Sequence, residues 1–106
     1  EHNLKGLACS GGKVHGRAFV AASLEEAQDL KEGDILIAPY TDPGWTPLLG
    51  RVSAVITEVG GVLSHAAVIS REYGIPAVLN VSGATEKIPT GTEICVDGDK
   101  GEVSFL

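Results

Sequence analysis

A histidine follows a pair of glycines at a spacing that suits phosphate chemistry. Gly60 and Gly61 end an apolar run, Ser64 and His65 follow, and Gly74 and Pro76 come after an uninterrupted stretch. Glycine ends helices in the left-handed conformation and proline prevents their continuation, so we expect a helix over 64–73. His65 then lies in the first turn of that helix.

The first turn of a helix has backbone N–H groups without intrahelical partners, and the helix dipole adds partial positive charge there. Together they make an anion site, which Gly60 and Gly61 let a phosphate approach without a Cβ in the way. The same field disfavours an imidazolium, and a neutral imidazole can act as a nucleophile. The pattern therefore predicts His65 as a phosphoryl acceptor. Gly60, Gly61 and Ser64 would stabilise the phosphate, although Ser64 could instead cap the helix.

Two further residues are candidates for support. Arg71 lies six residues after His65, so it reaches a phosphate only by bending around the helix. Asp42 could orient His65 if its loop folds over the ring, but a turn contact with Gly44 or Trp45 is the favoured interpretation. On spacing alone a structural alternative stays open, because a single histidine at a helix start is more often a cap or a surface residue.

The elements that must position these residues alternate between strands and helices. Apolar runs predict strands over 16–21, 34–38, 54–59 and 77–81, and two more within 93–106 around a glycine-rich turn. A capping box from Ser23 to Glu26 predicts a short helix to about Leu30. Thr46 suits an N-cap, with Pro47 as the first helical residue. We interpret the first six residues as a tail and 8–13 as a turn.

Composition excludes several classes of protein. A chain of 106 residues is one domain, and a net charge of −6 without a basic stripe argues against nucleic acid or an anionic membrane as partner. No apolar run approaches the ~20 residues of a membrane span. The two cysteines and three histidines lack metal-ligand spacing, so we expect no metal, reduced thiols and a cytoplasmic protein. The first residue is Glu, which suggests a segment excised from a longer protein.

The stretch 60–78 resembles the phosphohistidine signature of the mobile, or swivelling, domain of phosphoenolpyruvate-utilising enzymes. The segments 41–45 and 96–103 are also similar to loops of that family, and the resemblance spans Leu4 to Leu106. Many members carry a small hydroxylic residue two positions before the histidine, where this chain has Leu63. Leu63 together with 71–74 looks more like rifampicin phosphotransferase and phosphoenolpyruvate synthase-like members, so regulation by phosphorylation at that position is not expected.

The resemblance implies an α/β fold, a compact β/β/α swivelling phosphohistidine domain over 1–106. It gives His65 the phosphohistidine role in a dikinase-type phosphotransferase. An ATP-grasp nucleotide-binding domain would phosphorylate His65 with ATP and Mg2+, and a separate acceptor-substrate domain would receive the group. This domain would bind no cofactor and would be inactive alone. The alternatives are a non-catalytic interaction module, a stand-alone carrier acting in trans, and a hydrolase with His65 as general base. The last lacks a recognisable nucleophile or metal site.

Overall fold

The computed structural model describes residues 3–106, and its strands form one eight-stranded sheet. The strands are β1 (Leu4–Lys5), β2 (Leu7–Ser10), β3 (Lys13–Val20), β4 (Ile35–Ala38), β5 (Ala54–Thr57), β6 (Ala77–Leu79), β7 (Glu93–Asp97) and β8 (Glu102–Phe105). Their order is β1-β8-β7-β3-β4-β5-β6-β2. The four central neighbours, β3 to β6, run parallel, and every other pairing is antiparallel.

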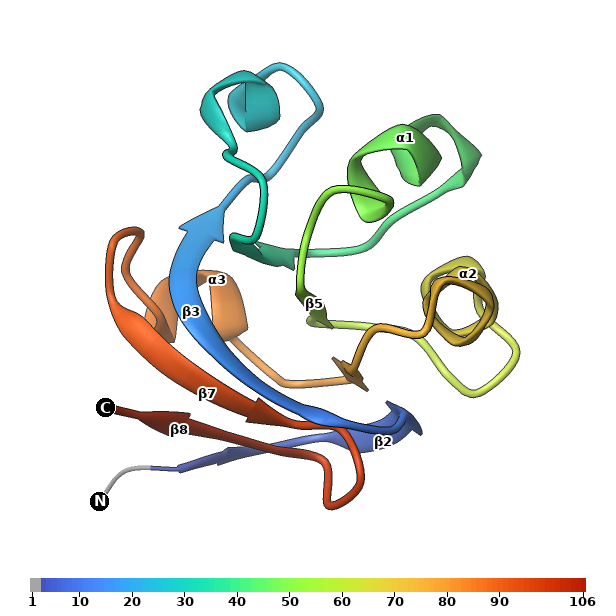
Figure 1. The fold of residues 1–106 in the computed structure, drawn as a ribbon, viewed down its shortest axis with the longest axis vertical. Coiled ribbons are helices and arrows are strands. Elements are labelled where there is room, and N and C mark those ends of the chain that lie inside the picture. Colours follow the sequence, from blue (N-terminus) through green and yellow to red (C-terminus); the bar gives the residue numbers. More distant parts are fainter. Residues whose placement is uncertain (1–2) are drawn as a thin grey trace.

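The sheet bends into two layers because β3 belongs to both of them (Figure 1). Residues 13–17 of β3 pair with β7, whereas 18–20 pair with β4. At the other end, β1 and β2 are separated only by Gly6, yet they pair with β8 and β6. A Cβ on Gly6 would lie 2.4 Å from the Leu79 carbonyl oxygen, so this corner requires glycine.

These pairings correct the prediction of an N-terminal tail. Among the first six residues, Glu1 and His2 lie outside the described residues, and Leu4–Lys5 pairs with β8 instead of hanging free. Likewise, 8–13 is not one turn, since β2 continues to Ser10 and β3 begins at Lys13. Strand pairing between distant parts of the chain decides both segments, and neither carries a strong local strand pattern.

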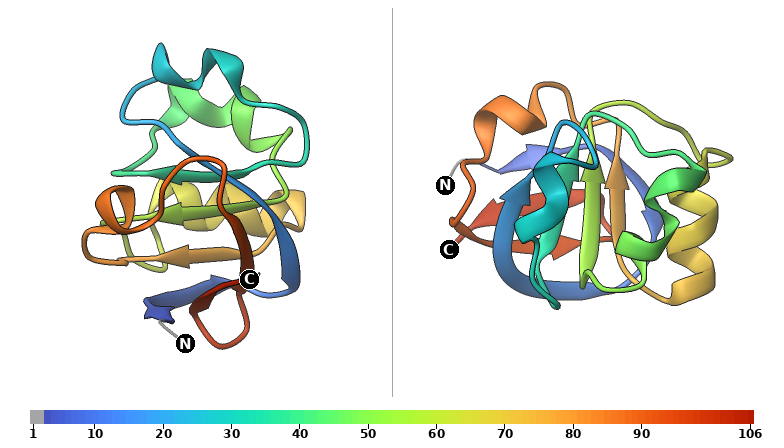
Figure 2. Two further views of the ribbon diagram at one scale, coloured as in Figure 1. Left: turned by 90° about the vertical axis from the view of Figure 1, so that its left-hand side faces the viewer. Right: turned by 90° about the horizontal axis from the view of Figure 1, so that it is seen from above.

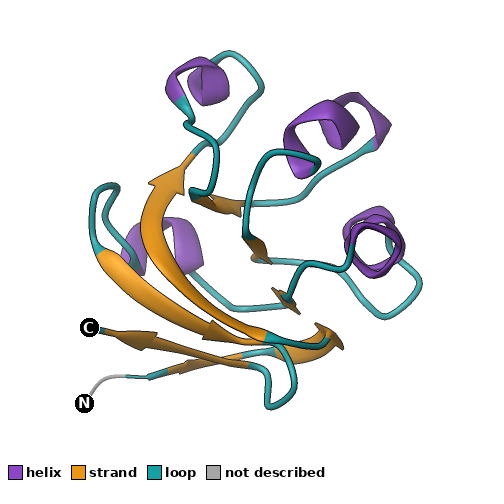
Figure 3. Cartoon of the chain, viewed as in Figure 1, coloured by secondary structure: helices purple, strands orange, loops and turns teal. Residues whose placement is uncertain are grey.

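Side chains that alternate along the parallel strands point to opposite faces of the sheet and pack into two separate hydrophobic cores. On β4, Ile35 and Ile37 pack between the two sheet layers, with Ile56, Val78 and Ile94. The intervening Leu36 and Ala38 face the other way and pack beneath the helices, with Trp45, Leu49, Ala66 and Ala67. The order of layers is therefore β/β/α, as the resemblance implied (Figure 3).

The helical segments are short, and most of them cover one face of the parallel strands (Figures 1 and 3). They are η1 (Glu26–Asp29), η2 (Pro43–Trp45), α1 (Thr46–Leu49), α2 (His65–Tyr73) and α3 (Ala84–Lys87). The sequence analysis missed α3. Its first residue, Ala84, and the residue that follows it, Ile88, are buried in the core between the sheet layers. Within residues 3–106, no helix has the length and apolar character needed to cross a membrane.

The predicted capping box forms in a shifted version. The Glu26 N–H donates to Ser23 Oγ at 3.3 Å, but the Glu26 carboxylate accepts from Ala22 N at 2.8 Å rather than from Ser23 N. Only a 3-10 turn follows, ending at Asp29. Thr46 is the first residue of α1 and not its N-cap, which is Trp45. The side-chain cap lies one turn earlier, where Asp42 precedes η2 and accepts a hydrogen bond from Gly44 N at 2.9 Å.

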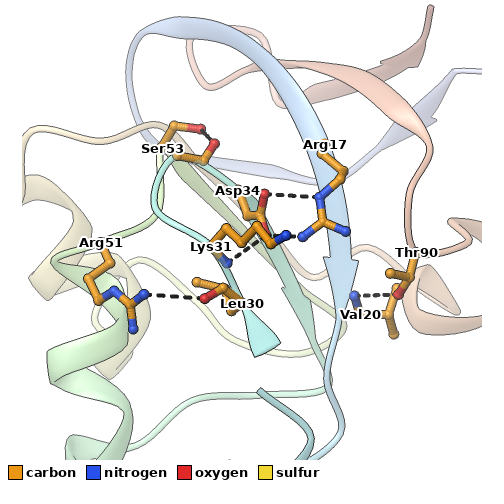
Figure 4. A network of polar contacts seen from close by, with 9 residues as sticks. Arg17, Val20, Leu30, Lys31, Asp34, Arg51, Ser53 and Thr90 are labelled. Atoms are coloured by element: carbon orange, nitrogen blue, oxygen red, sulfur yellow. Dashed lines mark hydrogen bonds and ion pairs between the residues drawn. The ribbon is translucent and has the colours of Figure 1, made fainter. Parts of the chain in front are cut away.

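The two edges of the parallel strands differ in what they present. At the amino edge, Asp34 is 5% exposed and accepts hydrogen bonds from Arg17 Nη2 at 2.6 Å and from Lys31 N at 2.9 Å (Figure 4). At the carboxyl edge, the loops after β4 and β5 run side by side toward α1 and α2 (Figure 2, right). The C-terminus lies on the opposite side of the molecule from α2.

Candidate functional site

His65 is the first residue of α2, and Ser64 is its N-cap. Ser64 Oγ accepts from Ala67 N at 3.4 Å and donates to the Gly61 carbonyl at 2.8 Å. At the other end, Gly74 takes the left-handed conformation with φ 71°. The predicted bounds of this helix are confirmed, because both caps are local sequence signals. Ser64 therefore caps the helix through its oxygen. Its hydroxyl proton is already donated to the Gly61 carbonyl and is not free for a phosphate oxygen.

Both ring nitrogens of His65 are held by threonine hydroxyls. Thr41 Oγ1 lies 2.9 Å from Nδ1, and Thr46 Oγ1 lies 3.0 Å from Nε2. Thr41 belongs to the loop after β4, and Thr46 is the first residue of α1. A neutral imidazole has one N–H and one lone pair, and a hydroxyl can satisfy either. The two hydroxyls can therefore satisfy either tautomer of a neutral ring, and neither partner of the ring is a carboxylate.

The sequence analysis did not assign this role to the two threonines. It used Thr46 as a helix cap and quoted Thr41 only within the loop 41–45. The available signal was the placement of one threonine on each side of the turn Asp42–Trp45. Asp42 is bonded to Gly44 N, the turn contact that the sequence favoured, and neither hydrogen bond of the His65 ring goes to it.

The loop before α2 brings backbone N–H groups to the histidine. Within the described chain, the N–H groups of His65 and Ala66 have no hydrogen-bond acceptor. Gly60 has φ 132°, and a Cβ there would lie 3.2 Å from Ser64 Oγ. A Cβ on Gly61 would meet no atom within 4 Å, so the space beside its backbone is open. Unpaired amides and an open backbone face are what an incoming anion requires.

Arg71 bends back from α2 and holds this loop. Its Nη2 donates to the Val62 carbonyl at 2.6 Å, and its Nε donates to the Cys9 carbonyl at 2.8 Å. The guanidinium thus ties the glycine loop to α2 and β2, and it carries positive charge without a carboxylate partner in these bonds. Burial raises the pKa of the Cys9 thiol, and the Arg71 charge opposes that shift by a smaller amount.

The residues around His65 form an open surface. Across residues 3–106 the structure has no pocket, and it contains no group of three His, Cys, Asp or Glu side chains placed to hold a metal ion. The site therefore presents an imidazole beside unpaired backbone N–H groups, and no pocket in the described residues encloses them.

Comparison with known proteins finds similar sequences over most of the chain. Residues 30–101 match the family model described as "PEP-utilising enzyme, mobile domain". Rifampicin phosphotransferase of Bacillus cereus is 50% identical over 101 residues, which are 95% of this chain and 12% of that protein. Phosphoenolpyruvate synthase of Aquifex aeolicus is 44% identical over 103 residues, which are 97% of this chain and 12% of that protein. The chain thus spans about an eighth of the length of these relatives.

Two solved structures are also similar. An Enzyme I solution structure has 34% identity and a TM-score of 0.63, covering 73% of this chain and 32% of that one. Aconitase X of Thermococcus kodakaraensis has a TM-score of 0.78 and covers 100% of this chain and 99% of that one. Its identity is 24%, so it shows the likeness of the fold alone.

Proposed function

Because the chain belongs to the mobile-domain family of PEP-utilising enzymes, we propose that it is a phosphohistidine carrier. His65 accepts a phosphoryl group from a donor on an ATP-grasp nucleotide-binding domain and delivers it to an acceptor bound by another domain. One observation carries this proposal: an imidazole bonded only to threonine hydroxyls belongs to the first residue of a helix whose first two amides, those of His65 and Ala66, are unpaired. The relatives are much longer than this chain, so they have room for both of those domains.

Nε2 is the nucleophilic atom in this proposal. It lies at the tip of the ring, whereas Nδ1 is bonded to the carbon that carries Cβ, so Nε2 is less hindered toward an incoming phosphorus atom. In the tautomer that this proposal assigns, Nδ1 carries the proton and donates it to Thr41 Oγ1, which lies 2.9 Å away. The Thr46 hydroxyl donates to the Nε2 lone pair at 3.0 Å while the site is at rest.

In the transfer, the Nε2 lone pair forms a bond to phosphorus. The bond from phosphorus to the donor oxygen breaks, and its electron pair leaves with that oxygen. The Thr46 hydroxyl, released from Nε2, and the amides of His65 and Ala66 then bond the phosphoryl oxygens. In the second transfer an acceptor hydroxyl oxygen attacks phosphorus, its proton passes to a base, and the electron pair of the P–N bond returns to Nε2.

The nucleotide, the Mg2+ ion and the acceptor belong to the other domains. The described residues offer no pocket and no cluster of metal-ligating side chains to hold the first two. Proteins named for two different reactions, rifampicin phosphotransferase and phosphoenolpyruvate synthase, are 50% and 44% identical to this chain. Such similarity to both supports a carrier whose own residues do not select the acceptor.

The test uses a chimera in which this chain replaces the aligned segment of the Bacillus cereus relative. With ATP and Mg2+, we expect an acid-labile, base-stable phosphate on His65, located by mass spectrometry under alkaline conditions. The His65→Ala chimera is the control and should carry none. Phosphate on another residue, or equal labelling of the His65→Ala chimera, would contradict the proposal.

A further inference from the structure

The loop 60–63 before the cap of α2 is not held in place by packing. Its last two residues, Val62 and Leu63, are 49% and 86% exposed. Ser64 N and Oγ donate to the carbonyl of the second glycine, at 3.0 and 2.8 Å. Among the described residues beyond Ser64, Arg71 alone gives a hydrogen bond to the backbone of this loop, from Nη2 to the Val62 carbonyl at 2.6 Å. The position of the loop therefore depends on Arg71.

Arg71 ties the loop to the sheet as well as to its own helix. Its Nε donates to the carbonyl of Cys9 at 2.8 Å, and Cys9 is a buried residue of β2, which pairs with β6. A guanidinium is planar and presents its N–H groups as a rigid fork. One group with a fixed shape thus sets the distance between the Cys9 carbonyl in the sheet and the Val62 carbonyl in the loop.

The bond from Arg71 also orients the peptide group that follows Val62. No described peptide bond is cis, and in a trans peptide the C=O and the N–H point in opposite directions within one plane. Because the Val62 carbonyl is turned toward Arg71, the N–H of Leu63 is turned away from it. That N–H has no acceptor among the described residues, as is true of the amides of His65 and Ala66. All three are therefore free to bond an anion.

Arg71 does not touch the imidazole, whose two nitrogens are bonded to threonine hydroxyls. Its own two bonds go to neutral carbonyls, and within residues 3–106 neither ion pair includes it. The positive charge is therefore left without a carboxylate to neutralise it, and it favours an anion at the loop. Any effect of Arg71 on the chemistry of His65 has to pass through the loop and this charge.

We propose that Arg71 is a positioning residue for phosphoryl transfer to His65, and that it holds the loop so that the Leu63 N–H joins the amides of His65 and Ala66 in bonding the phosphoryl oxygens. The inference rests on the proposed function. No bond to Arg71 forms or breaks in the transfer, and its guanidinium keeps its protons. Donors that are already in place stabilise developing charge without the cost of rearranging during the reaction.

The experiment compares Arg71→Gln with Arg51→Gln in the chimera described above. Arg51 is the matched control, because its Nη2 also donates to a backbone carbonyl, that of Leu30 at 3.3 Å, but at the amino edge (Figure 4). Each variant is labelled at His65 from ATP and Mg2+ and, separately, by phosphoramidate, a small chemical donor that needs no second domain. Urea denaturation sets an assay temperature at which the variants are folded.

We expect Arg71→Gln to slow labelling by about 10-fold with both donors, equivalent to ~1.4 kcal/mol. The KM for ATP should not change, since the nucleotide binds elsewhere, and Arg51→Gln should match the wild type. Arg71→Lys keeps the charge but replaces the fork with a point charge, so it should recover only part of the lost rate. If Arg71→Gln does not fold, Arg71→Lys takes its place, and it should be slower than the wild type with both donors.

The other results would overturn the inference. Unchanged labelling of a folded Arg71→Gln protein would remove the role of Arg71, and full recovery by Arg71→Lys would mean that charge acts without positioning. A fall with ATP alone would place Arg71 in a contact with another domain instead of in the site of His65. A wild-type chimera labelled by phosphoramidate but not from ATP would contradict the proposed function, and the phosphoramidate rates would still decide the role of Arg71.

Discussion

The two edges of the parallel strands use arginine in opposite ways. At the amino edge, Arg17 Nε and Nη2 both donate to the Asp34 carboxylate, at 3.2 and 2.6 Å (Figure 4). The arginine and the aspartate therefore neutralise each other in an ion pair within the chain. At the carboxyl edge, Arg71 bonds two carbonyl oxygens, and the amides of His65 and Ala66 remain unpaired nearby. The first edge is completed within the chain, whereas the second is left able to bind something else.

This difference follows from the geometry of parallel sheets. The loops that leave the carboxyl ends of parallel strands meet at one edge, where open α/β sheets bind their ligands. Here the loops after β4 and β5 contribute Thr41 and the glycine pair, and the helix starts that follow them contribute Thr46 and His65. The amino edge has turns that join helices back to strands, and residues there can serve stability alone.

The largest expected effect is that one substitution at each edge changes a different property: phosphate labelling at the carboxyl edge and stability at the amino edge. His65→Asn should abolish phosphate labelling while changing the free energy of unfolding by about 1 kcal/mol or less, because the side chain is only half-buried. Asp34→Asn should leave labelling intact but cost about 1–3 kcal/mol, since it weakens the bonds of a buried carboxylate to Arg17. Mass spectrometry and urea denaturation of both variants measure the two quantities. Loss of labelling in a folded Asp34→Asn protein would contradict the claim that the amino edge serves stability alone.

The next contrast lies within the carboxyl edge, between the two threonines. Thr41→Val removes the acceptor of the Nδ1 proton, so the ring should shift toward the Nε2–H tautomer and labelling should slow by about 100-fold. Thr46→Val removes the hydroxyl at Nε2, and the Nδ1–H tautomer should persist. Nitrogen-15 NMR of the His65 ring reports the tautomer in each variant. An unchanged tautomer in Thr41→Val would refute the assignment of Nε2 as nucleophile.

A smaller effect separates the two glycines that the sequence treated alike. Gly60→Ala places a side chain at φ 132° and 3.2 Å from Ser64 Oγ, so it should cost about 1–3 kcal/mol and loosen the cap of α2. A Cβ at Gly61 meets nothing within 4 Å, and Gly61→Ala should stay within ~0.5 kcal/mol of the wild type. Urea denaturation compares the pair, and equal losses would mean that the strain is not at Gly60.

Local signals predicted the parts of the site that lie in one segment. Ser64, His65 and Gly74 are close in sequence, and capping chemistry alone places them, so the helix and its histidine could be predicted. The bonds from Thr41 and Thr46 to His65 join residues 24 and 19 positions apart, and no periodicity encodes such a distance. The pairing of Leu4–Lys5 with β8 was missed for the same reason.

For Arg71, the sequence predicted how the side chain must lie but not which atoms it contacts. Its position six residues after His65 correctly indicated that it would have to bend around α2, but the carbonyls that it reaches belong to Cys9 and Val62. Those atoms are brought together only when β2 pairs with β6 beneath the helix. Sequence reasoning could identify the charged group, while the packed structure decides what that group holds.

The smallest expected effect distinguishes two thiols, one beneath the site and one away from it. Cys9, whose carbonyl holds Arg71, is 5% exposed, whereas Cys95 on β7 is half-buried. Burial raises the pKa of the Cys9 thiol from its usual value of 9.0, so the folded state prefers the protonated form. That preference contributes fully to stability below pH 9.0 and is lost as the pH rises through the folded-state pKa. At neutral pH, iodoacetamide should therefore modify Cys95 well before Cys9, as followed by peptide mass spectrometry, and raising the pH toward 10 should favour unfolding. Faster modification of Cys9 would mean that the layer beneath Arg71 opens readily, and the carboxyl edge would then lack the firm support that the contacts of Arg71 give it.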